Sequence, residues 1–104
     1  MRHSVTIGVK EKYVAVVTNA IHDLMGWESE PHDSLYLGEY KLFHAPEKMI
    51  VKYNFVEAEG EWDFPDHPHF PVLIVVGETE RPEFFRDMVA NLGFENEVIS
   101  GKPW

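Results

Sequence analysis

The sequence predicts a single α+β domain, residues 1–104, in which two helices cover one face of a mostly antiparallel sheet. Three observations favour this two-layer fold. The chain has 104 residues, of which 44% are apolar and 26% charged, as is typical of one globular core. Short apolar runs rich in β-branched residues are bounded by turn residues. Two other stretches carry apolar residues at helical spacing and end at a glycine.

The first unit is predicted as a strand over residues 5–9 followed by a helix. The segment "YVAVVT", 13–18, is rich in β-branched residues, which also suit a strand that pairs with 5–9 as a hairpin. Against the hairpin, apolar residues keep helical spacing up to Gly26, a suitable left-handed cap. These residues are Val14, Val17, Ile21 and Leu24. We therefore expect a helix.

The second unit repeats this plan near the C-terminus. "FPVLIVVGE" predicts a buried central strand, and "TERPEFFRDMVANLGF" predicts a helix with Pro82 in its first turn and Gly93 as its cap. "NEVIS" then returns as a final strand. Residues 5–30 align with residues 72–97 without a gap, so both units are expected to share one order of strand, helix, glycine, aromatic residue and acid.

The middle of the chain is predicted to form a loop and a hairpin. "EPHDS", 30–34, is expected to be a loop, and two strand-like segments, 35–45 and 48–59, meet at "PEK". The whole order is β-α-β-β-(β)-β-α-β. It favours a ferredoxin-like split β-α-β arrangement with one or two inserted strands.

The charge of the chain restricts its partners. Eighteen acidic residues against nine Lys and Arg give a formal net charge of −9. Such a surface repels phosphates, so direct binding to nucleic acid is not expected, whereas a basic protein or a cation is a suitable partner. No apolar run is long enough to cross a membrane, and the start lacks the apolar core of a signal peptide. We expect a cytoplasmic protein.

The segment "VEAEGEWDF" is the first candidate site. In an extended chain, four carboxylates would lie on one face at a repeat of about 6.6–6.8 Å, close to the step between phosphates along a nucleic-acid strand. These carboxylates belong to Glu57, Glu59, Glu61 and Asp63. With Trp62 as an aromatic anchor, this row predicts a partner-binding surface of the DNA-mimic type. The alternative is a solvated edge strand that blocks aggregation, with Gly60 turning the chain.

The segment "DFPDHPHFPV" is the second candidate site. In an extended chain His67 and His69 point the same way and can share a metal ion, with Asp66 and the distant His44 as further ligands. Such a set suits Zn, Fe or Mn. The alternative is a stiff connection, because the three prolines hold the loop extended and remove backbone donors. These prolines are Pro65, Pro68 and Pro71.

The leading functional hypothesis is protein–protein binding by a small acidic protein. One specific form is a regulator or inhibitor of a basic nucleic-acid-binding protein, of the kind that viruses and mobile elements encode. The alternative is a metal-dependent enzyme or metal-binding module that uses His67 and His69. A third hypothesis is a homodimer that binds a small ligand. Trp104 is expected to be docked rather than frayed, and a subunit interface is one place where it could dock. The chain has no Cys, phosphate-binding loop or nucleophile motif, so the sequence favours binding over catalysis.

Overall fold

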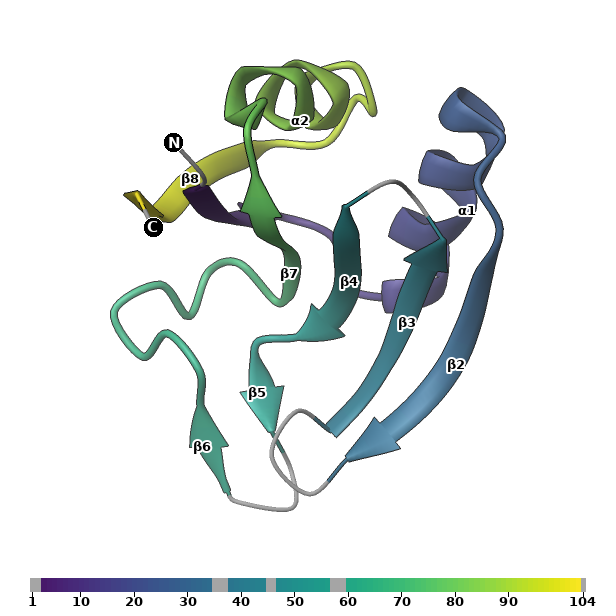
Figure 1. Cartoon of the computed structure of the whole chain (residues 1–104). Coiled ribbons are helices and arrows are strands. Elements are labelled where there is room, and N and C mark those ends of the chain that lie inside the picture. Colours follow the sequence, from purple (N-terminus) through teal and green to yellow (C-terminus); the bar gives the residue numbers. More distant parts are fainter. Residues whose placement is uncertain (1–2, 35–37, 45–46, 57–59, 104) are drawn as a thin grey trace.

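The computed structural model describes residues 3–34, 38–44, 47–56 and 60–103, and it has two layers (Figure 1). One layer is a six-stranded sheet, and the other contains the two helices. The elements are β1 (His3–Val9), α1 (Val14–Met25), β2 (Ser29–Ser34), β3 (Gly38–His44), β4 (Lys48–Tyr53), β5 (Phe55–Val56), β6 (Glu61–Trp62), β7 (Val72–Thr79), α2 (Pro82–Ala90) and β8 (Asn96–Pro103). The expected docking of Trp104 lies outside the described residues.

The large sheet has the strand order β2-β3-β4-β7-β1-β8, and each pair of neighbours in it is antiparallel. β5 and β6 pair separately as a small second sheet. The prediction of an α+β fold with a mostly antiparallel sheet is therefore confirmed. In the part of the chain that the structure describes, no helix is long and apolar enough to cross a membrane.

Both helices pack on the same side of the large sheet. Alternate residues of the central strands join the buried residues of both helices in one hydrophobic cluster. The register explains this arrangement, since Ile7 of β1 lies opposite Ile74 of β7, and Ile74 lies opposite Val51 of β4. The period of two along each strand therefore places the aliphatic side chains of three neighbouring strands on one face.

Residues 14–18 begin helix α1, as the spacing predicted, and Tyr13 precedes them in an extended conformation. Val14, Val17 and Ile21 are buried, and Gly26 ends α1 with a left-handed φ of 71°. The burial of this stripe outweighs the poor helix propensity of its β-branched residues. Leu24 was expected on the same stripe, but it is exposed.

The expectation that residues 30–34 form a loop is wrong, because Ser29–Ser34 forms strand β2 at one edge of the sheet. Its Pro31 and Asp33 are residues of low strand propensity. An edge position tolerates them, because one side of the strand needs no hydrogen-bond partner and charges there discourage pairing with other chains. Pairing with β3, rather than local propensity, makes this segment a strand.

Candidate metal centre

Between β4 and β7 the structure describes residues 54–56 and 60–71, which include the two short strands of the small sheet (Figure 1). The Pro/His part of this segment consists of two consecutive turns. The His67 N–H donates to the carbonyl of Phe64 at 2.9 Å, and the Phe70 N–H donates to the carbonyl of His67 at 3.1 Å. Pro65 and Pro68 each occupy the second position of a turn, where a fixed φ is favourable. The expectation of an extended loop is therefore wrong.

Asn54 holds this pair of turns in place. Its side chain is fully buried, and its carboxamide nitrogen donates to the carbonyls of His67 and Phe70, at 3.0 Å in each case. Its carboxamide oxygen accepts from the N–H of Phe64 at 2.9 Å, and its own N–H donates to the carbonyl of Pro71 at 2.8 Å. One side chain thus satisfies buried backbone groups of both turns, which orders them before any ligand binds.

Phe70 fixes where the turns lie on the sheet. Its buried ring occupies the space above Gly8 of β1, where a Cβ atom would come within 2.7 Å of the ring. The cross-strand neighbour of Gly8 on β8 is Glu97. The ring of His69 in turn lies 4.3 Å from the ring of Phe70, centroid to centroid. The turn residues that surround Phe70 are therefore brought to Glu97.

The result is a group of three side chains that can bind a metal ion. One ligand atom from each of His67, His69 and Glu97 lies within 4.8 Å of the other two. His67 is half-buried, whereas His69 and Glu97 are exposed to solvent. A bound ion would draw the three groups closer together, because imidazole nitrogens and carboxylate oxygens bind Zn²⁺ at about 2.0–2.2 Å. Two imidazoles and one carboxylate form a set that suits Zn²⁺ or Fe²⁺.

The other two residues of the predicted ligand set lie elsewhere. Asp66 is an exposed residue of the first turn and does not join the three-residue group. His44 ends β3, and three strands separate β3 from β8, so their backbones are roughly 19 Å apart at about 4.8 Å per strand. The structure thus brings together His67 and His69 of the predicted set, and it adds Glu97, which the sequence did not indicate.

The described part of the acidic segment, Glu61 to Asp63, follows a turn of the chain at Gly60. Val56 pairs with Glu61 across a chain reversal in which Gly60 has a left-handed φ of 66°. Glu61 and Trp62 are exposed on the returning strand, and the Trp62 ring lies 5.2 Å from that of Phe55. Glu57 and Glu59 lie outside the described residues. A glycine adopts the left-handed region at low energetic cost, which explains why the chain turns at Gly60.

The Asp63 carboxylate is engaged within the protein. It accepts a hydrogen bond from the ammonium group of Lys52, whose side chain is only 1% exposed although it carries a charge. The same ammonium group donates to the carbonyl of Tyr53 at 2.9 Å. A buried cation requires such partners, so Asp63 has a structural role in addition to any role at a partner surface.

No protein-family model matches this chain, and no curated protein is significantly similar to it.

Proposed function

We propose that the protein is a transition-metal-binding module whose ligands are His67, His69 and Glu97. The observation that carries this proposal is the convergence of their ligand atoms within 4.8 Å in a segment that Asn54 holds in place. Two surface histidines two residues apart are common by chance. The arrangement here is more specific, because Glu97 of the distant strand β8 lies beside both histidines and the buried Asn54 side chain orders the turns.

The ligand set favours Zn²⁺, with Fe²⁺ as the alternative. Three protein ligands leave at least one coordination position for water or another molecule, as in catalytic zinc sites. When bound, the ion would supply Lewis-acid chemistry at that open position. The chain's own contribution is to hold two imidazoles and one carboxylate on a solvent-accessible surface, with Phe70 as an apolar base beneath them.

Metal analysis of the untagged protein tests this function. We expect Zn or Fe to co-purify in near-equimolar amount and to be lost from a His67→Ala/His69→Ala variant. A His22→Ala variant is the matched control, because His22 is an exposed histidine on α1 whose ring contacts the carbonyl of Trp27. If added Zn²⁺ binds the double variant as tightly as the wild-type protein, the proposal is wrong.

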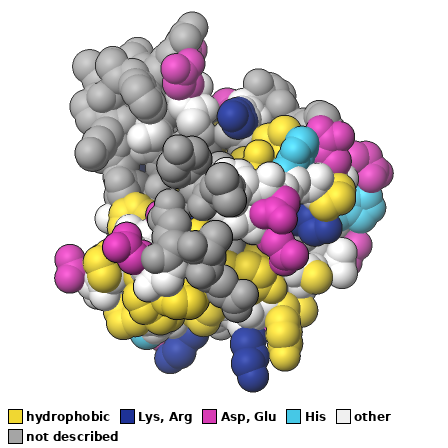
Figure 2. Space-filling view, turned by 90° about the horizontal axis from the view of Figure 1, so that it is seen from below, with side chains coloured by type: hydrophobic (Ala, Val, Ile, Leu, Met, Phe, Trp, Pro, Cys, Tyr) yellow, Lys and Arg dark blue, Asp and Glu magenta, His cyan; other side chains and the backbone are white. Residues whose placement is uncertain are grey.

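Binding to a basic protein is a second candidate function, favoured by the exposed aromatic pair on the β5–β6 hairpin. Phe55 and Trp62 are each 38% exposed, and Glu61 lies beside them. Acidic and hydrophobic side chains also lie near one another on the face shown in Figure 2. An aromatic anchor surrounded by carboxylates complements a cationic surface, such as that of a nucleic-acid-binding protein.

A pull-down at increasing salt concentration tests this second function. We expect capture of a basic protein that weakens as the salt concentration rises and is lost when Trp62 becomes Ala or when Glu57, Glu59 and Glu61 become Gln. Salt-independent capture, or capture that persists in these variants, would contradict it.

We further propose a ferredoxin-like arrangement with an inserted hairpin, and a cytoplasmic location. The order β8-β1-β7-β4 supports it, with α1 following β1 and α2 following β7. In this description β2 and β3 are the inserted strands. The absence of cysteine agrees with a reducing compartment.

A further inference from the structure

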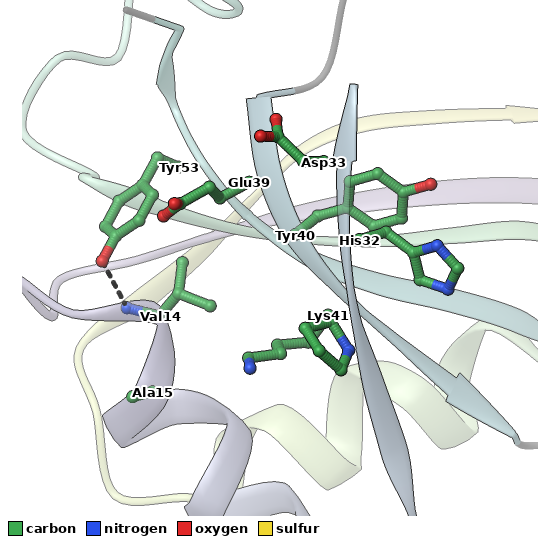
Figure 3. Close-up of a pocket in the computed structure, with 9 residues that line it drawn as sticks. Val14, Ala15, His32, Asp33, Glu39, Tyr40, Lys41 and Tyr53 are labelled. Carbon is green, nitrogen blue, oxygen red and sulfur yellow. Dashed lines mark hydrogen bonds between the residues drawn. The ribbon is translucent and has the colours of Figure 1, made fainter. Parts of the chain in front are cut away.

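A pocket of about 450 Å³ opens on the helix side of the sheet (Figure 3), and none of the proposed metal ligands lines it. It lies where β2 and β3 extend past the first turn of α1. Its apolar wall includes Val14 of α1 and Pro31 of β2, and the ring of Tyr53 closes one end. Its volume falls within the range of about 300–1,000 Å³ that is typical of small-molecule sites.

Two carboxylates lie side by side at this pocket. Asp33 of β2 is the direct cross-strand partner of Glu39 of β3, and both line the cavity. Like charges in this position destabilise a strand pair. Among the described residues, neither carboxylate has a hydrogen bond or ion pair to offset that repulsion. A ligand with an ammonium group would offset it.

Two hydrogen-bond donors also face the pocket. Lys41 is two residues after Glu39 on β3, and both side chains project toward Tyr53 and the start of α1 (Figure 3). The Lys41 ammonium group has no carboxylate partner among the described residues. The Tyr53 hydroxyl accepts the N–H of Val14 at 3.4 Å, which leaves its own hydrogen free to be donated. These two donors suit a carboxylate.

We propose that this pocket binds a free α-amino acid with an apolar side chain. Asp33 and Glu39 would hold its ammonium group, and Lys41 and the Tyr53 hydroxyl would hold its carboxylate. Its side chain would lie against Val14 and Pro31. The presence of both charge signs around one cavity favours a zwitterion over a simple anion or a simple cation.

The experiment is an NMR titration of the wild-type protein with leucine and with two analogues that each lack one charge. Leucine is expected to shift the amide signals of Val14, Lys41 and Tyr53. Isopentylamine, which lacks the carboxylate, and 4-methylpentanoate, which lacks the ammonium group, should each bind at least about tenfold more weakly, because each loses a charge-assisted hydrogen bond.

Two variants assign the contacts. Lys41→Met keeps the length of the side chain and should weaken leucine binding by about tenfold or more, and Glu39→Gln should act in the same direction. Lys48→Met and Glu61→Gln are the controls, since both residues are exposed outside the pocket. The proposal is overturned if leucine, valine and phenylalanine leave these signals unchanged, if either analogue binds as tightly as leucine, or if Lys41→Met binds leucine normally.

Discussion

On the helix side of the large sheet, alternate residues of β1, β4 and β7 are buried aliphatic side chains that form one cluster with both helices. On the other side, a few specific contacts order the described part of the segment between β4 and β7, residues 54–56 and 60–71, and hold it against the sheet. These are the Asn54 hydrogen bonds, the ion pair of Lys52 with Asp63 and the packing of Phe70 on Gly8.

The two sides differ in how they tolerate change. Hydrophobic packing is spread over many contacts, and a core accepts volume-conserving exchanges at a cost below about 1.5 kcal/mol. A directional polar contact has no near equivalent, so its loss leaves a buried group unsatisfied. The side of the sheet opposite the helices, here called the polar side, should therefore be more sensitive to single substitutions. The positions of the proposed metal ligands depend on its contacts.

The largest effect is expected from Asp63→Ala. This change leaves the buried Lys52 ammonium group without its carboxylate. Removal of one partner of a fully buried pair costs about 3–5 kcal/mol, and we expect the lower end of this range because the Asp63 side chain is 36% exposed. Lys52→Met should cost much less, because it removes the charge and keeps an apolar stem. In urea unfolding, the Lys52→Met/Asp63→Ala double variant should be more stable than Asp63→Ala alone. Equal stability of these two variants would contradict a structural role for the pair.

Asn54→Ala should come next. It removes hydrogen bonds to three backbone groups of the turns, each worth about 1 kcal/mol, so the free energy of unfolding should fall by about 3 kcal/mol. Asn19→Ala is the control, because Asn19 is exposed on α1 and its loss should change stability by less than about 0.5 kcal/mol. Similar effects of the two substitutions in thermal or urea unfolding would refute the role assigned to Asn54.

Gly8→Ala tests the packing of the Phe70 ring on β1. An added methyl group would lie 2.7–2.8 Å from atoms of Phe70, so the ring must move, at a cost of about 1–3 kcal/mol. The same change at Gly77 meets nothing within 4 Å and should be tolerated. We expect Gly8→Ala, unlike Gly77→Ala, to lower both the free energy of unfolding and the affinity for Zn²⁺. A neutral Gly8→Ala variant would argue against the packing described here.

A smaller and pH-dependent effect is expected at Glu47, whose carboxylate contacts Arg81 just before α2. The Arg81 guanidinium hydrogen-bonds to its carboxylate and, together with the Thr79 hydroxyl, holds the pKa of Glu47 below its usual value. A lowered folded-state pKa stabilises the protein above the unfolded-state pKa, and this stabilisation is lost as the pH falls through the folded-state pKa.

Glu47→Gln should therefore lower the free energy of unfolding at pH 7 by about 1–2 kcal/mol. Its difference from the wild-type protein should shrink as the solution is acidified. Urea unfolding at several pH values measures this difference, with the exposed Glu80→Gln variant as the control. A difference that stays constant on acidification would contradict the role of the Arg81 contact.

The sequence predicted the regular side of the molecule better than the irregular side. Short β-branched apolar runs bounded by turn residues and the helical spacing before Gly26 are local signals, and both led to the observed elements. Ser29–Ser34 was missed because its strand conformation depends on pairing with β3 at the edge of the sheet.

The sequence predicted two of the three proposed metal ligands. His67 and His69 are neighbours in the chain, but Glu97 joins them only through the register that places it opposite Gly8. The β1–β8 register and the packing of Phe70 on Gly8 both depend on tertiary structure, and the local sequence gives no signal for either. The role of Asn54 was equally hidden, because an asparagine before a loop usually indicates only a turn.

The most direct test of the account is the Zn²⁺ affinity of Glu97→Gln, compared with the wild-type protein by competition with a chromogenic chelator. Glu95→Gln is the matched control, since Glu95 is exposed nearby and pairs with Lys10 instead. Loss of a direct ligand should weaken binding by at least about tenfold in Glu97→Gln and leave Glu95→Gln unchanged. Wild-type affinity in Glu97→Gln would show that the polar side of the sheet does not assemble the metal site proposed here.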